Sequence, residues 1–95
     1  MEIKKVGIIA NIDKEKSSEY ALFLKSWLVE RGVSVVFEEA LARRSGEERG
    51  ADRRKLVHMV DLIVVFGGDG TMLRAARAAR GVDIPIVGIN MGGFG

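Results

Sequence analysis

The residues best suited to chemistry form a glycine-rich turn, Gly67-Gly68-Asp69-Gly70-Thr71. Glycines can adopt positive φ angles and leave backbone N–H groups open to an approaching ligand. A helix that starts near Thr71 would add unpaired N–H groups and the positive end of its dipole, which together favour a bound anion. We therefore predict that this turn binds a phosphate group, with Gly67, Gly68, Gly70 and Thr71 around it.

Asp69 adds a carboxylate to the turn. A carboxylate repels a bound phosphate unless a metal ion lies between them, or unless the carboxylate handles a proton or a sugar hydroxyl. The alternative is a sharp corner without a ligand, in which Asp69 or Thr71 only caps the following helix. An apolar run before the turn and an alanine-rich stretch after it favour phosphate binding.

The elements that position this turn follow from the apolar pattern. Short β-rich runs predict four strands, at residues 3–10, 33–37, 62–66 and 84–89. Helices are predicted between them, at residues 17–31, from residue 52 and at residues 72–80. This alternation predicts an α/β fold, an open parallel sheet with flanking helices, in which the first strand is central.

Further polar residues follow the ends of other strands. Asn90, Gly92 and Gly93 form a second glycine-rich loop after the last strand, and Asn11 and Asp13 follow the first. In a parallel sheet these ends meet at one edge, where ligands bind. We predict that Asn90, Gly92 and Gly93 join the site, whereas turn chemistry is the favoured explanation for Asn11 and Asp13.

The first helix has an apolar stripe at helical spacing. Ser17 is its expected N-cap, Gly32 lies just past its expected end, and the stripe comprises Tyr20, Phe23, Leu24, Trp27 and Leu28. Core packing explains this stripe better than base stacking by Tyr20 and Trp27.

The charged stretch at residues 38–55 is expected to be a solvated loop. Its arginines could instead form a flap over a nucleotide pocket. His58, the single histidine, has no partner in the sequence, so a role as general base is not favoured.

Composition excludes several classes of protein. Ninety-five residues allow one small domain, and a net charge of +2 gives little support for nucleic-acid binding. The chain has no cysteine, which excludes disulfides and thiolate chemistry, and one histidine excludes a multi-histidine zinc centre. No segment is long enough for a signal sequence or membrane span, so we expect a cytoplasmic protein without a membrane partner.

Two strings of residues are similar to signatures of the NAD kinase family. The first signature resembles Gly67-Gly68-Asp69-Gly70-Thr71-Met72-Leu73, and the second resembles residues 88–95. One residue of the second string departs from the family, because Phe94 stands where the family most often has leucine. The specific resemblance covers residues 61–95. The first string is shared with a wider superfamily of lipid kinases and phosphofructokinases, and the second favours NAD kinase.

The resemblance implies a fold, an activity and roles for residues. The fold would be Rossmann-like and similar to the N-terminal domain of phosphofructokinases. The substrates would be NAD and ATP, with polyphosphate as a possible donor in place of ATP. A divalent metal, with magnesium expected, would assist transfer of a phosphoryl group to the 2′-hydroxyl of the adenosine ribose. Asp69 would be the catalytic residue that contacts this hydroxyl, and no residue is assigned as a protein metal ligand.

The resemblance also implies a larger assembly. Residues 1–95 would be an N-terminal nucleotide-binding domain, truncated before a β-rich C-terminal domain, and the full-length protein would form a homo-oligomer. The 95 residues alone are expected to be inactive. A lipid or sugar kinase of the same superfamily and a non-catalytic nucleotide-binding module remain as alternatives.

Overall fold

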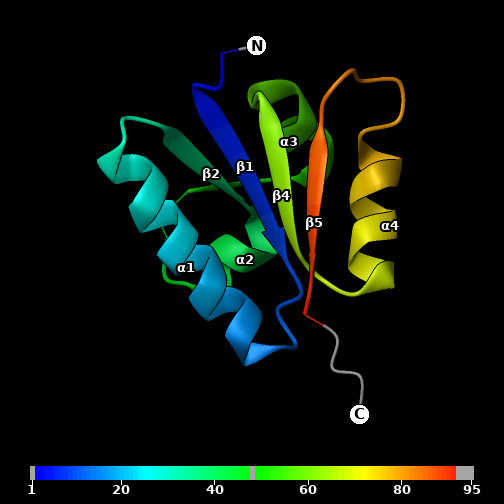
Figure 1. Cartoon of the computed structure of the whole chain (residues 1–95). Coiled ribbons are helices and arrows are strands. Elements are labelled where there is room, and N and C mark those ends of the chain that lie inside the picture. Colours follow the sequence, from blue (N-terminus) through cyan, green and yellow to red (C-terminus); the bar gives the residue numbers. More distant parts are fainter. Residues whose placement is uncertain (1, 48, 92–95) are drawn as a thin grey trace.

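The computed structural model describes residues 2–47 and 49–91. A parallel sheet forms its centre, in the order β3-β2-β1-β4-β5 (Figure 1). Its strands are β1 at Lys5–Ala10, β2 at Ser34–Glu38, β3 at Gly50–Ala51, β4 at Leu62–Gly67 and β5 at Ile86–Asn90. The predicted α/β class, the four predicted strands and the central place of the first strand are confirmed.

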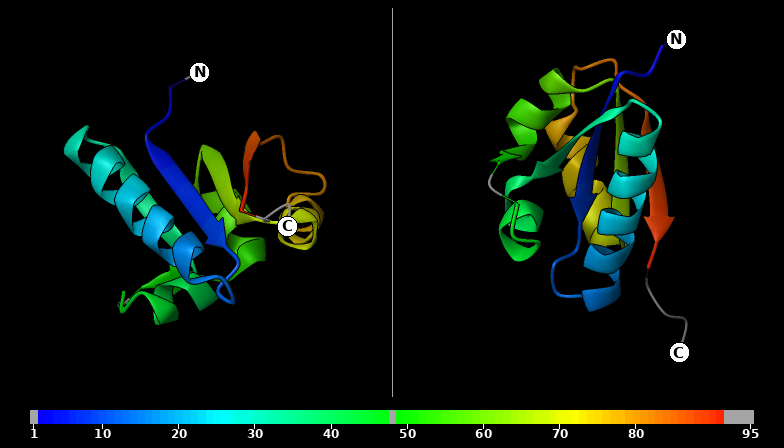
Figure 2. Two further views of the ribbon diagram at one scale, coloured as in Figure 1. Left: turned by 60° about the horizontal axis from the view of Figure 1, so that its bottom comes forward. Right: turned by 90° about the vertical axis from the view of Figure 1, so that its left-hand side faces the viewer.

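In the described part of the chain, four helices flank the sheet: α1 at Glu15–Glu30, α2 at Glu39–Arg44, α3 at Arg53–Met59 and α4 at Asp69–Ala78. Helix α1 covers one face of the sheet, whereas α3 and α4 cover the other (Figure 2). None of the helices within residues 2–47 and 49–91 is long and apolar enough to cross a lipid bilayer.

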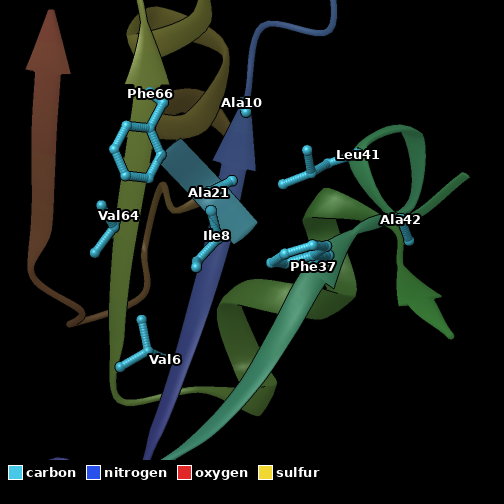
Figure 3. Packing of buried hydrophobic residues seen from close by; sticks show 9 residues of the cluster. All are labelled: Val6, Ile8, Ala10, Ala21, Phe37, Leu41, Ala42, Val64 and Phe66. Atoms are coloured by element: carbon cyan, nitrogen blue, oxygen red, sulfur yellow. The ribbon is translucent and has the colours of Figure 1, made fainter. Parts of the chain in front are cut away.

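Alternating strand residues build a core on each face of the sheet. Val6, Ile8 and Ala10 of β1 pack with Val64 and Phe66 of β4 on the side of α1 (Figure 3). The residues between them, among them Ile9, Ile63 and Val65, pack on the opposite side against α3 and α4. Strands buried on both faces explain why β1 and β4 are apolar almost throughout.

The prediction of a loop at residues 38–55 is wrong for most of that stretch. Residues 39–44 form α2, and residues 50–51 pair with β2 as the edge strand β3. Leu41 and Ala42 lie in the core that Figure 3 shows, and no solvent reaches Leu41. Two buried residues among many charges are enough to anchor this short helix, but too few to give a periodic pattern.

Helix α1 presents a different face to the core from the one predicted. Tyr20, Phe23 and Trp27 are 50%, 70% and 44% exposed, while Ser17 and Ala21 are fully buried. Leu24 and Leu28 pack against the core as predicted. Small side chains at residues 17 and 21 let the helix approach the sheet closely, and larger aromatic groups could not fit there.

The start of α1 also differs from the prediction, whereas its end agrees. The helix begins at Glu15 after Lys14, so Ser17 lies inside it and does not cap it. Gly32 follows the helix with a φ angle of 79°, as expected for a glycine just past a helix end.

Candidate functional site

Three strands end side by side at the carboxyl edge of the sheet. Gly67 lies opposite Asn90 in the pairing of β4 with β5, and the Met91 amide donates a 2.9 Å hydrogen bond to the Gly67 carbonyl. The Asn11 amide donates a 2.8 Å bond to the Phe66 carbonyl. The carboxyl ends of β1, β4 and β5 therefore lie side by side. The helices that follow β1 and β4 cover opposite faces of the sheet, which is where open sheets bind ligands.

The predicted convergence of the two glycine-rich segments holds as far as Met91. Asn90 is exposed and directly beside the first segment, while Gly92 and Gly93 lie outside the described residues. Lys14, from the loop after β1, donates a hydrogen bond of 3.4 Å from Nζ to the Met91 carbonyl. This contact brings a positive charge to the same edge.

The start of α4 corrects the prediction for the backbone of the turn. The helix begins at Asp69 and not near Thr71, and none of Gly67, Gly68 and Gly70 has a positive φ angle. The first hydrogen bond along the helix runs from the Met72 amide to the Gly68 carbonyl, at 3.1 Å. The amides of the first helical residues have no acceptor within the helix, so they and the helix dipole still favour an anion.

The glycines of the turn serve different purposes. A Cβ on Gly67 would lie 2.8 Å from Cβ and Oγ1 of Thr71, whose side chain is buried under the turn. A Cβ on Gly68 would meet nothing within 4 Å, and one on Gly70 would only touch the Arg74 guanidinium at 3.5 Å. Gly67 is therefore required for internal packing, whereas Gly68 leaves its backbone open toward solvent.

Asp69 is exposed at the first turn of α4. Gly68 occupies the N-cap position without a side-chain hydrogen bond, so neither Asp69 nor Thr71 caps the helix. Within residues 2–47 and 49–91, no hydrogen bond or ion pair uses the Asp69 carboxylate. The capping alternative is therefore wrong, and the carboxylate is available to a ligand bound at the helix start.

A hollow of about 170 Å³ lies beside this turn, between the loop after β1, the end of β2 and α4. Thr71 lines it, but Asp69 and Asn90 do not. The polar and charged residues around it are Asn11, Asp13, Glu38, Arg53, Thr71 and Arg74. These residues come from separate parts of the chain: the loop after β1, the end of β2, and helices α3 and α4.

Asn11 and Asp13 show the local turn chemistry that the sequence favoured. The Asn11 Oδ1 atom accepts a 3.0 Å hydrogen bond from the Asp13 amide, which fixes the loop after β1. Both residues also line the hollow. The hydrogen bond of the turn uses the Asp13 amide and not its carboxylate, so the carboxylate takes no part in the turn.

Arg53, Glu38 and Arg74 were not predicted as site residues. The Arg53 Nε atom lies 3.5 Å from Oε2 of Glu38, and Arg74 donates a 3.4 Å hydrogen bond to Oγ1 of Thr71. Burial raises the pKa of the Glu38 carboxyl, and the positive charge of Arg53 opposes this shift. One signal could have identified Glu38, because it ends a parallel strand at the edge where ligands bind, whereas the local sequence of the two arginines gives no such signal.

His58 lies at the opposite edge of the sheet. It is exposed on α3 and lines a hollow with Asp61, Asp83 and Pro85, near the amino ends of β4 and β5. The structure does not bring it to the carboxyl edge with Thr71.

The described residues offer little to a metal ion by themselves. Residues 2–47 and 49–91 contain no cluster of three His, Asp or Glu side chains suited to hold a metal. A Mg²⁺ ion in kinases is held by one or two carboxylates together with substrate phosphates and water. One exposed carboxylate, Asp69, beside the amides at the start of α4 fits that pattern.

Comparison with known proteins agrees with this geometry. Residues 6–95 match the family model of the ATP-NAD kinase N-terminal domain. The NAD kinases of Syntrophotalea carbinolica and Solibacter usitatus are each 40% identical, over 98% of this chain and 33% and 32% of their own lengths. The chain thus spans about a third of the length of these relatives.

A solved structure shows the same fold. Yeast NADH kinase, crystallised in complex with NADH, superposes with a TM-score of 0.78 over 98% of this chain and 31% of its own, at 19% identity. The family model covers nearly the whole chain and includes both glycine-rich segments. The chain therefore belongs to the NAD kinase family, in which it corresponds to the N-terminal domain.

Proposed function

We propose that the protein containing this chain is an NAD kinase, which transfers the terminal phosphoryl group of ATP to the 2′-hydroxyl of the adenosine ribose of NAD. Inorganic polyphosphate is an alternative donor. The observation that carries the proposal is the start of α4, where Gly68 is open and the Asp69 carboxylate has no partner among the described residues. Asn90 is close to this start, because it lies opposite Gly67 in the sheet. Membership of the NAD kinase family selects NAD as the acceptor.

Residues of this chain have two roles in the phosphoryl transfer: some bind the phosphates, and Asp69 accepts a proton. The amides at the start of α4 hold phosphate oxygens, and Lys14 and Arg74 add positive charge nearby. Asp69 accepts the proton of the ribose hydroxyl as the new P–O bond forms and the bond to the leaving phosphate breaks. The products are NADP, the shortened donor and a protonated carboxyl group.

A magnesium ion, when bound, would neutralise charge on the donor phosphates. Among residues 2–47 and 49–91, Asp69 is suited to contact it, because its carboxylate is exposed and has no partner there. The buried Thr71 side chain fixes the turn from below, and Gly67 permits it to do so. Positioning of this kind provides most of the rate in phosphoryl transfer.

We further propose that residues 1–95 form the N-terminal nucleotide-binding domain of a longer enzyme. The support is that curated relatives are about three times as long as the stretch they share with this chain. Residues beyond that stretch would complete the NAD site, since the described part offers a phosphate-binding edge but no pocket of matching size for a dinucleotide there.

The test is an assay of the full-length protein with NAD, ATP and magnesium, in which NADP is measured with an NADP-specific dehydrogenase. NADP formation that depends on all three components is the expected result. Diacylglycerol and fructose 6-phosphate serve as competing acceptors under the same conditions. Phosphorylation of either of these without NADP formation would overturn the proposal and favour another kinase of the superfamily.

A further inference from the structure

A further hollow is lined by residues of α3 and α4 and by Asp52, just before α3. These two helices cover the same face of the sheet (Figure 2). The volume of the hollow is about 400 Å³. The arginine groove, as we name it, is lined by Asp52, Arg53, Arg54, Arg74, Arg77 and Ala78. Four guanidinium groups from two separate helices therefore surround one hollow.

The described residues neutralise only part of the positive charge of the arginine groove. Arg53 forms an ion pair with Glu38, while the Asp52 carboxylate accepts a 2.8 Å hydrogen bond from the Arg54 amide at the start of α3. Three arginines have no ion pair within residues 2–47 and 49–91: Arg54, Arg74 and Arg77. Like charges gathered in this way repel one another, and an anion between them removes that repulsion.

The lining indicates which kind of anion fits. Guanidinium groups bind phosphate oxygens through paired hydrogen bonds, and they keep their charge at any physiological pH. The volume of the groove suits a small ligand and not a protein surface. It has no aromatic side chain on which a nucleic-acid base could stack, so a phosphate group is the feature that it recognises.

The arginine groove continues into the candidate site. Arg53 and Arg74 line both the groove and the smaller hollow that contains Thr71. Between Thr71 and Arg77 the axis of α4 rises about 9 Å, at about 1.5 Å per residue. One phosphate group cannot span that distance, but a chain of linked phosphates can.

We propose that the arginine groove binds the linked phosphates of the phosphoryl donor that lie beyond the group transferred. Its catalytic role rests on the proposed function, since it assumes that the donor reacts beside Asp69. Arg53 and Arg74 contact the donor near Thr71, and Arg54 and Arg77 hold its distal phosphates. The shared chemistry is condensed phosphate, which both a nucleoside triphosphate and inorganic polyphosphate supply.

Binding to the full-length protein is the first test. Tripolyphosphate and ATP are titrated separately by calorimetry into the parent protein and into Arg54→Ala, Arg77→Ala and the double variant. Each single change is expected to weaken binding about tenfold, because one charge-assisted contact to phosphate is lost. Arg44→Ala, which removes an exposed arginine of α2 outside the groove, is the matched control and should bind like the parent protein.

The two ligands identify the natural source of the phosphates. Weaker binding of both shows that the groove holds phosphates common to the two donors, whereas an effect on one alone assigns the groove to that donor. Unchanged affinity for both ligands in the double variant would overturn the proposal. Circular dichroism and the melting temperature establish that the variants are folded, which is expected because Arg54 and Arg77 are exposed.

Steady-state kinetics separate this proposal from the proposed function. In an active NAD kinase, the double variant is expected to raise the KM for the donor about tenfold or more while the KM for NAD stays the same. A protein that binds tripolyphosphate through Arg54 and Arg77 but forms no NADP would overturn the proposed function and leave the groove standing. NADP formation with an unchanged KM for each donor would overturn the groove alone.

Discussion

Gly67 and Thr71 are packed so closely that a Cβ on Gly67 would lie 2.8 Å from the Thr71 Oγ1 atom. The contact joins the last residue of β4 to the first turn of α4, and the threonine side chain is buried beneath it. The start of α4 is therefore packed directly against the end of β4. Gly67 thus permits close packing between β4 and α4, while the backbone of Gly68 is open to a ligand.

Gly67→Ala is therefore expected to destabilise the fold, by about 1–3 kcal/mol, because Thr71 must move to admit the added methyl group. Gly68→Ala is the matched control, since the same methyl group there meets no atom within 4 Å. Chemical denaturation of the two variants measures the difference. Equal stabilities would show that the Thr71 contact is unimportant, whereas weaker ATP binding by a stable Gly68→Ala protein would support the open role of Gly68.

Asp69→Asn should lower the turnover of the full-length kinase about 100-fold or more, because the amide cannot accept the ribose proton. Stability should hardly change, since the Asp69 carboxylate is exposed and makes no contact within the described part of the chain. Asp83→Asn, at the opposite edge of the sheet, is the control for loss of a surface charge. Near-normal turnover of the Asp69 variant would exclude it as the base.

Leu41→Ala should cost about 2–5 kcal/mol of unfolding free energy, because it leaves a cavity in the core. Phe23→Ala should cost about 0.5 kcal/mol or less, since Phe23 is 70% exposed. Urea denaturation of both variants gives the comparison. The reverse order would mean that the apolar stripe of α1, and not α2, faces the core.

Asp61 should make the stability depend on pH in acid. Its Oδ2 atom accepts hydrogen bonds of 2.9 and 3.0 Å from the amides of Lys4 and Lys5, and these bonds lower the pKa of the carboxyl below its ordinary value of 3.8. The unfolded chain therefore takes up the proton first as the pH falls. Stability from Asp61 is complete above pH 3.8 and is lost as the pH falls through the lower pKa of the folded state.

Asp61→Asn tests this dependence. The variant should melt at a lower temperature than the parent protein at pH 7, and the difference should shrink as the pH falls below 3.8. Asp83→Asn again serves as the control for a nearby carboxylate. A difference between Asp61→Asn and the parent protein that stays constant from pH 7 to pH 2 would contradict the assignment.

Local sequence was sufficient to identify four strands and the glycine-rich turn. Continuous apolar runs rich in β-branched residues, such as residues 62–66, are typical of a strand buried on both faces. The rule that ligands bind at the carboxyl ends of parallel strands was sufficient to bring Gly67 and Asn90 together, and the register of β4 with β5 agrees.

The tertiary structure decided which side of each helix is buried. The apolar stripe of α1 predicts an amphipathic helix, but the sheet accepts Ser17 and Ala21 because only small side chains fit at that distance. Helix α2 is stabilised by two buried contacts across the fold, which leave no periodic signal in a charged stretch. Hydropathy alone cannot predict how closely α1 approaches the sheet or which core residues α2 contacts.

Tertiary structure also decided where the charges lie. Arg53 and Arg74 are far apart in the sequence and belong to helices α3 and α4, yet they line the same two hollows because both helices begin at one edge of the sheet. Asp69 and Thr71 could be chosen from the motif alone, because the spacing of glycines is a local property. Arg53 and Arg74 could not be chosen in this way. Nothing in their local sequence distinguishes an arginine exposed to solvent from one that the fold places beside the site.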